Sequence, residues 1–161
     1  MNAPAQPWLR TADWPDQDHL RTWRNAHTQR FFYQSPITSA GQRQWFEEYR
    51  NRPDDFLFMV MQAEQAIGCI GIRLRSGVWD LYNVIRGIRS SSSAGFMAAG
   101  LRLVVDFASD VRPVAVRADV ISDNPARSWY LRNGFVIVAE NEKSCQLHYQ
   151  EPAGPTPGTT A

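Results

Sequence analysis

The sequence GVWDLYNVIRGIRSSSSAGFMAAGLRLVVDFA, residues 77–108, decides the expected fold. Residues 77–87 predict a strand, because β-branched and aromatic side chains are frequent in them. A loop of small residues follows at 87–95, and apolar side chains then recur at helical spacing over residues 96–108. A strand that leads through such a loop into a helix leaves unpaired backbone amides at the helix start, where phosphate groups bind.

Side chains around the loop also suit an anionic ligand. The serines at residues 90–93 add hydroxyl donors, and Gly95 allows a ligand to approach the backbone. Arg86 and Arg89 carry guanidinium groups that fit phosphate. A serine-rich loop before a helix is also common as a capped loop without a ligand, so this motif by itself leaves both interpretations open.

The flanking segments predict an α+β domain. The order is a strand, two helices, three or four strands, a helix, a strand, a helix and two strands. The expected strands cover residues 8–13, 56–62, 66–74, 77–87, 113–121, 135–140 and 144–149. The expected helices cover residues 13–27, the segment from the capping box at 39–42 to the residue before Pro53, residues 96–108 and residues 122–133.

Composition narrows the function classes. With 161 residues, the chain suits one domain, expected at 1–150, and a Pro/Gly/Thr-rich disordered tail at 151–161. A net charge of +1 with dispersed basic residues predicts no nucleic-acid or membrane partner. Apolar runs are too short for a signal peptide or a membrane span, so a cytoplasmic location is expected. Cys69 and Cys145 are expected to be reduced structural thiols, and the histidine and cysteine spacings predict no metal site.

A second motif, DNPARSWYLRNGF, occupies residues 123–135. It places Tyr130 on the last turn of a short helix, four residues before Gly134, which suits the helix C-terminus. Tyr130 taken alone is typical of a half-buried packing aromatic. Together with the strand, loop and helix at 77–108, the motif resembles the GNAT superfamily of acyl-CoA-dependent acyltransferases, and the resemblance covers about residues 8–149.

The resemblance implies an α+β, three-layer fold. Its central sheet is mixed and mostly antiparallel, has about six or seven strands splayed between the fourth and the fifth, and is flanked by about four helices. In the family, acyl-CoA is the co-substrate and its pantetheine arm lies in the gap against the fourth strand, here Asn83, Val84, Ile85 and Arg86. The pyrophosphate lies on the following loop, here Arg89, Ser92, Ser93, Ala94, Gly95 and Phe96.

The late helix has two roles in the family: its asparagine contacts the cofactor and its tyrosine protonates the departing thiolate. The matching residues are Asn124 and Tyr130. The chain departs from the family pattern in two places. With Gly95 aligned to the first glycine of the pyrophosphate signature, Ser92 replaces Gln or Arg, and Met97 replaces a second small residue. The interval from Asn124 to Tyr130 is also one residue shorter than usual. Asp123, the preceding residue, is therefore an alternative for the position of the family's asparagine.

N-acylation by a thioester needs a neutral amine, a polarised carbonyl and a path for the proton. A backbone amide near Val84 or Ile85 is the candidate donor to the thioester oxygen, and Tyr130 is the candidate acid. Asp80, on the same strand as the amide, is the candidate base, acting directly or through water. Alternative bases on or after the first two helices are His27, Glu47 and Glu48.

The expected acceptor is a primary amine of a small molecule, with an aminosugar nucleotide favoured, and the expected donor is acetyl-CoA or another acyl-CoA. Aromatic residues of the N-terminal third are candidates to line the acceptor pocket, with at least half expected in the core: Trp23, Phe31, Phe32, Tyr33, Trp45 and Phe46. Three alternatives stay open: a protein N-terminal acetyltransferase, a GNAT-like module that binds acyl-CoA without catalysis, and a protein-interaction domain. Relatives often dimerise, so a homodimer is also compatible with the resemblance.

Overall fold

The order of elements in the computed structural model, which describes residues 6–150, matches the predicted order. The predicted disordered tail at 151–161 lies outside the described residues. The strands are β1 (Trp8–Thr11), β2 (Asp55–Gln62), β3 (Gln65–Arg75), β4 (Val78–Arg86), β5 (Val116–Ile121), β6 (Phe135–Glu140) and β7 (Ser144–Tyr149). The α-helices are α1 (Gln17–Asn25), α2 (Ser39–Tyr49), α3 (Phe96–Val111) and α4 (Ala126–Arg132), with 3-10 turns η1 (Trp14–Asp16), η2 (Thr28–Arg30) and η3 (Ser91–Ser93).

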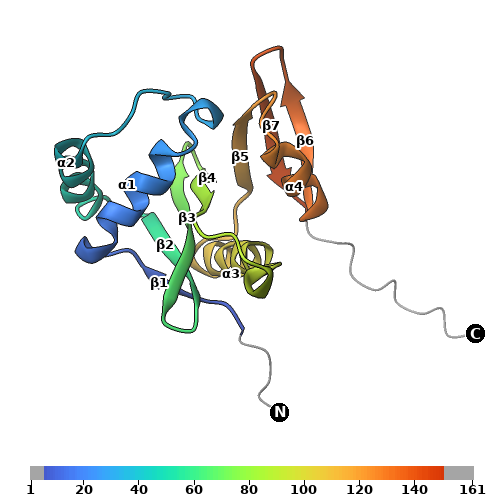
Figure 1. Cartoon of the computed structure of the whole chain (residues 1–161). Helices are drawn as coiled ribbons and strands as arrows, with labels where there is room; N and C mark the ends of the chain where they lie inside the picture. Colours follow the sequence, from blue (N-terminus) through green and yellow to red (C-terminus); the bar gives the residue numbers. More distant parts are fainter. Residues whose placement is uncertain (1–5, 151–161) are drawn as a thin grey trace, which may run out of the picture.

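The seven strands form one mixed sheet in the order β1-β2-β3-β4-β5-β7-β6. Only β4 and β5 run parallel, and the other neighbours are antiparallel. The β4–β5 ladder is short, because it ends at the pair Leu81↔Ala118. Beyond that pair the two strands diverge, so β1 to β4 separate from β5, β7 and β6 (Figure 1). The predicted splay between the fourth and fifth strands is confirmed.

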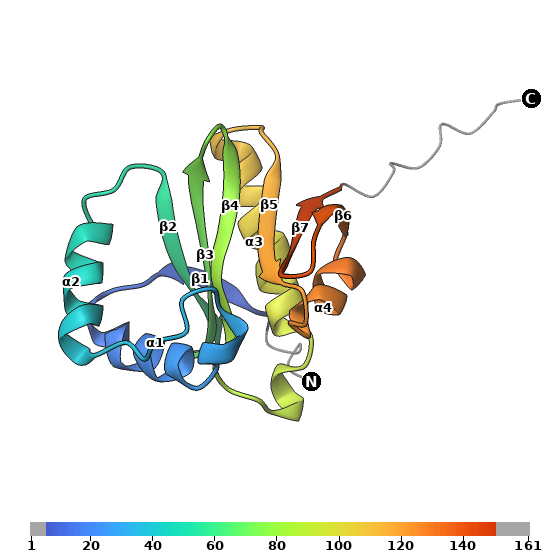
Figure 2. The same cartoon turned by 90° about the horizontal axis from the view of Figure 1, so that it is seen from above.

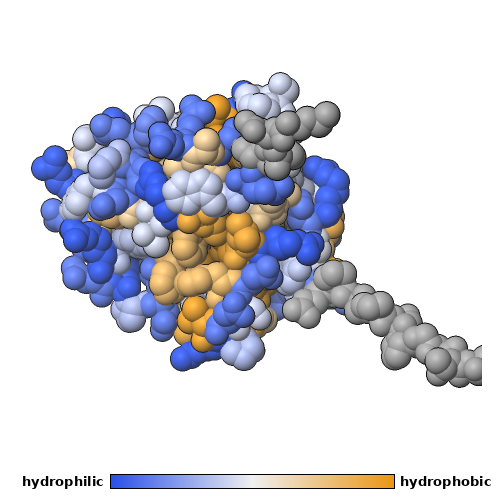
Figure 3. All heavy atoms as spheres, turned by 90° about the horizontal axis from the view of Figure 1, so that it is seen from below, coloured by the Kyte–Doolittle hydropathy of each residue, from blue (hydrophilic) through white to orange (hydrophobic). Residues whose placement is uncertain are grey.

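Helices cover both faces of the sheet and bury a separate core on each. α1 and α2 lie on one face, and α3 lies on the other (Figure 2). The core under α1 and α2 contains Leu57, Met59 and Cys69, whose side chains alternate with those of the second core. The second core, under α3, also contains Tyr130 from α4. Hydrophobic side chains also gather on the face seen from below, the side on which α3 lies (Figure 3).

The helix starts differ slightly from the predicted ones, for reasons of capping. The first helical segment begins as the 3-10 turn η1, where Asp13 accepts a hydrogen bond from the amide of Trp14. α2 is capped by Thr38 rather than Ser39, because Oγ1 of Thr38 accepts a bond of 3.0 Å from the amide of Gly41. The capping position was therefore predicted one residue too late, and the helix ends at Tyr49, before the predicted end at Pro53.

Candidate active site

A β-bulge opens the backbone of β4 at the centre of the sheet. Cys69 pairs with Ile85 and Gly71 pairs with Tyr82, so two residues of β4 face one residue of β3. One of the two, Asn83, has a φ of +46°, and its carbonyl accepts a hydrogen bond from the Cys69 thiol at 3.1 Å. Residues 82–86 lie beyond the last pair with β5. Their backbone on that side is therefore free to bind an extended ligand.

A cavity of about 810 Å³ extends from this opening to the face under α1 and α2. Its walls include six of the residues proposed from the sequence as catalytic or cofactor-binding: Asp80, Asn83, Val84, Ile85, Asn124 and Tyr130. The remaining cofactor candidates do not line it and belong to the end of β4, the loop after it and the first residue of α3: Arg86, Arg89, Ser92, Ser93, Ala94, Gly95 and Phe96. The fold thus brings the six lining residues together at the cavity and places the residues of the loop beyond the end of β4.

Tyr130 projects from α4 into the wall of the cavity and is only 4% exposed. Its ring packs edge-to-face on Phe135, with 5.0 Å between the ring centroids. Burial, with a smaller contribution from the charge of Asp80, raises the pKa of Tyr130 above its ordinary value. The hydroxyl therefore keeps its proton at neutral pH, as a proton donor must.

Asp80 lies among three arginines from the two neighbouring strands. Its Oδ2 is 3.4 Å from Nε of Arg73 and 3.7 Å from Nη1 of Arg75, both on β3. Its Oδ1 is 3.6 Å from Nε of Arg117 on β5. Arg73 and Arg117 are the cross-strand partners of Asp80 on either side, so the pleat directs all three side chains to the same face.

The loop before α3 is stabilised by its own hydrogen bonds. The hydroxyl of Ser90 lies 3.0 Å from that of Ser92 and 3.2 Å from that of Ser93. A guanidinium nitrogen of Arg86 donates to the carbonyl of Ser90 at 3.4 Å. Gly95 precedes α3 with a φ of +79°, a conformation that favours glycine. The backbone amides of the first turn of α3 remain the donors that this loop offers to an anion.

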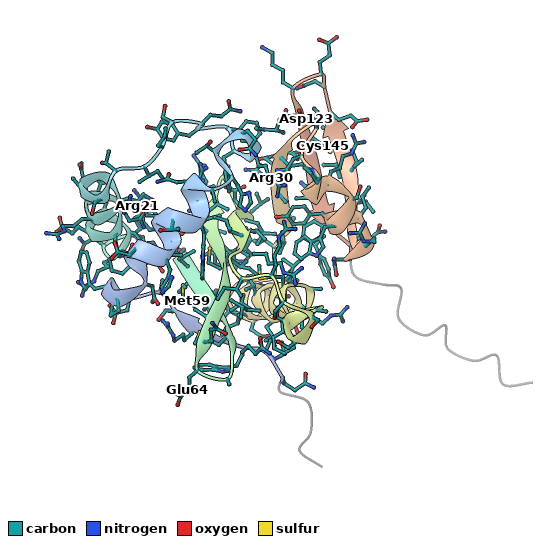
Figure 4. The ribbon with its side chains drawn as sticks, viewed as in Figure 1. Arg21, Arg30, Met59, Glu64, Asp123 and Cys145 are labelled. Carbon is teal, nitrogen blue, oxygen red and sulfur yellow. The ribbon has the colours of Figure 1, made fainter. Side chains whose placement is uncertain are left out.

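Asn124 joins two distant parts of the chain. Its Nδ2 donates to the carbonyl of Arg30 at 3.0 Å, and its Oδ1 accepts from the amide of Ala126 at 2.9 Å. The second bond satisfies the amide of Ala126, the first residue of α4. The first ties η2 to the loop after β5, and Arg30 lies between α1 and the β5 side of the molecule (Figure 4).

The aromatic residues proposed for the acceptor pocket divide into two groups. Phe31, Phe32, Tyr33 and Trp45 line the cavity. Trp23 and Phe46 are instead buried in the core beneath α1 and α2. The alternative bases Glu47 and Glu48 lie on α2 away from the cavity walls, and His27 is not among the lining residues either.

Sequence reasoning missed several polar residues of the cavity wall. These are Arg24, Arg73, Arg75, Tyr82 and Asp119. The only sequence signal was alternation: Arg73 and Arg75 are two apart on one strand, as are Asp80 and Tyr82 on the next, so each pair shares a face. Nothing local to Arg24 distinguishes it from a surface arginine on a helix.

Comparison with known proteins identifies the family. Residues 7–136 match the family model described as the acetyltransferase (GNAT) domain. The chain belongs to the GNAT family. A search of the curated proteins finds none that matches it. The predicted resemblance is therefore confirmed by the family model and the fold.

Several solved structures share the fold at low sequence identity. Apo FdhC, a nucleotide-linked sugar GNAT, superposes with a TM-score of 0.75 at 15% identity over 92% of this chain and 90% of FdhC. Spermidine N-acetyltransferase from Vibrio cholerae, solved with CoA and spermine, superposes with a TM-score of 0.74 at 16% identity over 89% of this chain and 94% of that protein. A domain from Methanocaldococcus jannaschii gives 0.73 at 13% identity, over 89% of this chain and 99% of that domain.

Residues 6–150 contain neither a helix able to cross a membrane nor a cluster of metal-binding side chains. None of the helices there combines the length and the apolar composition that crossing a membrane requires. Within the same residues, no three His, Cys, Asp or Glu side chains lie close enough together to hold a metal ion.

Proposed function

We propose that this GNAT protein transfers an acetyl group from acetyl-CoA to the primary amine of a small molecule, with an amino sugar favoured, by direct attack of the amine on the thioester. One observation carries the proposal: the open backbone of β4, the hydroxyl-bearing Tyr130 and the carboxylate of Asp80 border the same cavity.

The gap between β4 and β5 suits the pantetheine arm of acetyl-CoA. The arm is an extended chain with two amide groups, which need backbone partners when they leave water. Residues 82–86 offer such partners because no strand pairs with them on the β5 side. The amides at the start of α3 come after the loop 87–95 that follows β4, and they suit the pyrophosphate.

The proposed reaction proceeds by addition and elimination. The amine nitrogen attacks the thioester carbonyl carbon, and the oxygen gains negative charge that a backbone amide near Val84 or Ile85 stabilises. Asp80 takes the amine proton, directly or through water. The carbon–sulfur bond then breaks, and Tyr130 donates its proton to the sulfur. The products are an N-acetylated amine and CoA with a free thiol.

Small acceptors are favoured by the size of the cavity and by the proteins that share the fold. FdhC is a nucleotide-linked sugar GNAT, and the Vibrio cholerae enzyme was solved with spermine. Aromatic residues on the acceptor side, such as Phe31 and Trp45, offer faces on which a sugar ring can stack. A panel of amines in which only peptide N-termini were acetylated would contradict this acceptor class.

The substitution Tyr130→Phe tests the proposed acid. We expect turnover to fall by about 10²-fold with acetyl-CoA affinity unchanged, because only the proton donor is lost. Since burial raises the pKa of Tyr130, activity should show no loss from its ionisation below about pH 10. Thiol release measures turnover, and calorimetry measures binding of CoA.

The matched control is Tyr149→Phe, since Tyr149 also packs on Phe135 but is not among the lining residues. Unchanged turnover in Tyr130→Phe would remove Tyr130 as the acid. Binding of CoA without turnover of any amine would instead indicate a non-catalytic acyl-CoA-binding module.

A further inference from the structure

The charges of the cavity wall are unequal. Four arginines line it, and they are Arg24, Arg30, Arg73 and Arg75. The only acidic residues among its lining are Asp80 and Asp119. A ligand in this cavity therefore meets more positive than negative side chains.

Both carboxylates of the wall are already engaged. Asp80 contacts Arg73, Arg75 and Arg117. Asp119 lies 3.4 Å from Nε of Arg117. A polyamine acceptor carries several ammonium groups and needs free carboxylates to pair with them. Each carboxylate of the cavity wall is already paired with an arginine.

Two arginines of the wall, Arg24 and Arg30, are partly buried and lack an anionic partner within residues 6–150, and the guanidinium of Arg24 is also held by contacts with its neighbours. Among the described residues, no carboxylate lies within ion-pair distance of Arg24 or Arg30. The guanidinium of Arg24 lies over the ring of Phe31 at 3.4 Å from its centroid and donates to the carbonyl of Tyr33 at 3.1 Å. Burial lowers the pKa of Arg24 to about 10, so the group stays charged at neutral pH although its hydration is reduced.

The contacts of Arg24 orient its guanidinium and leave N–H donors available to bind an anion. Phe31 fixes the plane of the guanidinium, while Tyr33 takes one of its five N–H donors. The N-terminal turn of α2 borders the same cavity through Thr38 and Gly41 and adds the positive end of a helix dipole. A half-buried cation without a counter-ion loses part of its hydration, and a ligand anion would offset that loss.

We propose that the acceptor amine also carries an anionic group, a phosphate or a carboxylate, which Arg24 binds on the α1 and α2 side of the cavity. This inference rests on the proposed N-acetyl transfer and names its substrate class. An amine with a phosphate, such as a sugar nucleotide, fits it, and spermidine does not.

Paired acceptors test the proposal by thiol release. Glucosamine 6-phosphate is compared with glucosamine, and 4-aminobutyrate with butylamine, with spermidine as a fifth substrate. We expect a roughly tenfold or larger advantage in kcat/KM for the anionic member of at least one pair, because charge-assisted hydrogen bonds have that magnitude. An advantage in the glucosamine pair would indicate that the site prefers a phosphate, and an advantage in the butylamine pair would indicate a carboxylate.

Arg24→Gln should abolish that advantage by raising the KM of the anionic amines much more than the KM of the neutral amines or of acetyl-CoA, and Arg24→Lys should retain part of the advantage. The matched control is Arg43→Gln, an exposed arginine on α2 outside this cavity. Melting temperatures confirm that each variant is folded. Preferential acetylation of spermidine, or an advantage that survives Arg24→Gln, would overturn the inference while N-acetyl transfer stands. A rise in the KM of acetyl-CoA alone in Arg24→Gln would also overturn the inference, because it would show that Arg24 binds acetyl-CoA and not the acceptor.

A direct titration separates this inference from the proposed function. If no amine were turned over, N-acetyl transfer would fail, but binding of glucosamine 6-phosphate or 4-aminobutyrate to the wild-type protein can still be measured by calorimetry. Binding that disappears in Arg24→Gln supports the anion site. No binding of either anion by the wild-type protein overturns it.

Discussion

Asp80 lies where β4 and β5 are still paired, one residue before their ladder ends at Leu81. Its carboxylate therefore faces the cavity and at the same time contacts guanidinium groups from both neighbouring strands. The same side chain is thus placed to accept a proton from an amine and to balance the charge of the arginines. These two roles predict different pH profiles.

Asp80→Asn is expected to lower kcat/KM by about 10²-fold at neutral pH, because an amide cannot accept the amine proton. Part of the activity should return at high pH, where a larger fraction of the amine is neutral and hydroxide can accept the proton that the nitrogen loses after attack. The measurement is the pH profile of thiol release with one amine at a saturating acetyl-CoA concentration.

Asp119→Asn is the matched control for charge, since Asp119 also lines the cavity and contacts Arg117. Its effect should be small, because 39% of its side chain is exposed and water can replace the interaction. A loss in Asp80→Asn that is the same at every pH would show that Asp80 balances charge and does not accept the proton.

At the scale of elements, β4 carries most of the site. Its first residues pair with β5, its middle contains the bulge, and its end passes under α1. That last contact depends on Gly87, because a Cβ built there would lie 2.0 Å from a ring carbon of Trp23. Trp23 is itself buried, so it cannot move aside into water.

Gly87→Ala should lower the free energy of unfolding by about 1–3 kcal/mol, since the added methyl overlaps a buried ring. It should also raise the acetyl-CoA KM, because the loop that follows β4 must shift with it. Urea denaturation and steady-state kinetics measure the two effects.

Gly77→Ala provides the comparison for backbone strain alone. Gly77 has a φ of +79°, but no atom lies within 4 Å of the position that a Cβ would take, so only the conformational cost of about 1 kcal/mol applies. If the acetyl-CoA KM rose as much in Gly77→Ala as in Gly87→Ala, the close approach of Gly87 to Trp23 would not explain the effect.

At the scale of the whole molecule, the site depends on contact between the two parts of the splayed sheet. The side-chain amide of Asn124 reaches across to the carbonyl of Arg30, 94 residues earlier in the sequence. Residues 31–37, which follow η2, supply much of the acceptor side of the cavity. This bond therefore links the start of α4, which carries Tyr130, to the acceptor wall.

Asn124→Asp keeps the oxygen that accepts from the amide of Ala126 but removes the N–H donor to Arg30. We expect faster amide hydrogen exchange in residues 28–37 and a KM that rises for the acceptor more than for acetyl-CoA, because the acceptor wall loses its attachment. Exchange measured by mass spectrometry and steady-state kinetics provide the two readouts.

Asn133→Asp is the control, because the side chain of Asn133 donates only within α4, to the carbonyl of Trp129. It should leave exchange in residues 28–37 unchanged. A rise confined to the acetyl-CoA KM in Asn124→Asp would indicate that Asn124 contacts the donor instead, as the family resemblance implies.

The sequence by itself determined the order of elements, because that order follows from local properties. Apolar periodicity located the strands and helices, and their boundaries mostly agree with the structure within a few residues. The sequence also proposed Tyr130 and the backbone of β4, since a family motif marks them and a strand's free backbone requires no particular side chain. Both line the cavity, and their roles stay predictions.

Only the tertiary structure decided which charges face the cavity and which are already paired. Asp80 was proposed from its strand alone, and the arginines that surround it come from β3 and β5, up to 37 residues away in the chain. Arg24 looked like any helix arginine until the fold placed it over Phe31 beside the cavity without a carboxylate partner among the described residues. Sequence patterns report which face of an element is apolar, whereas the pairing of charges depends on distances between elements, and these exist only once the sheet and helices have packed together.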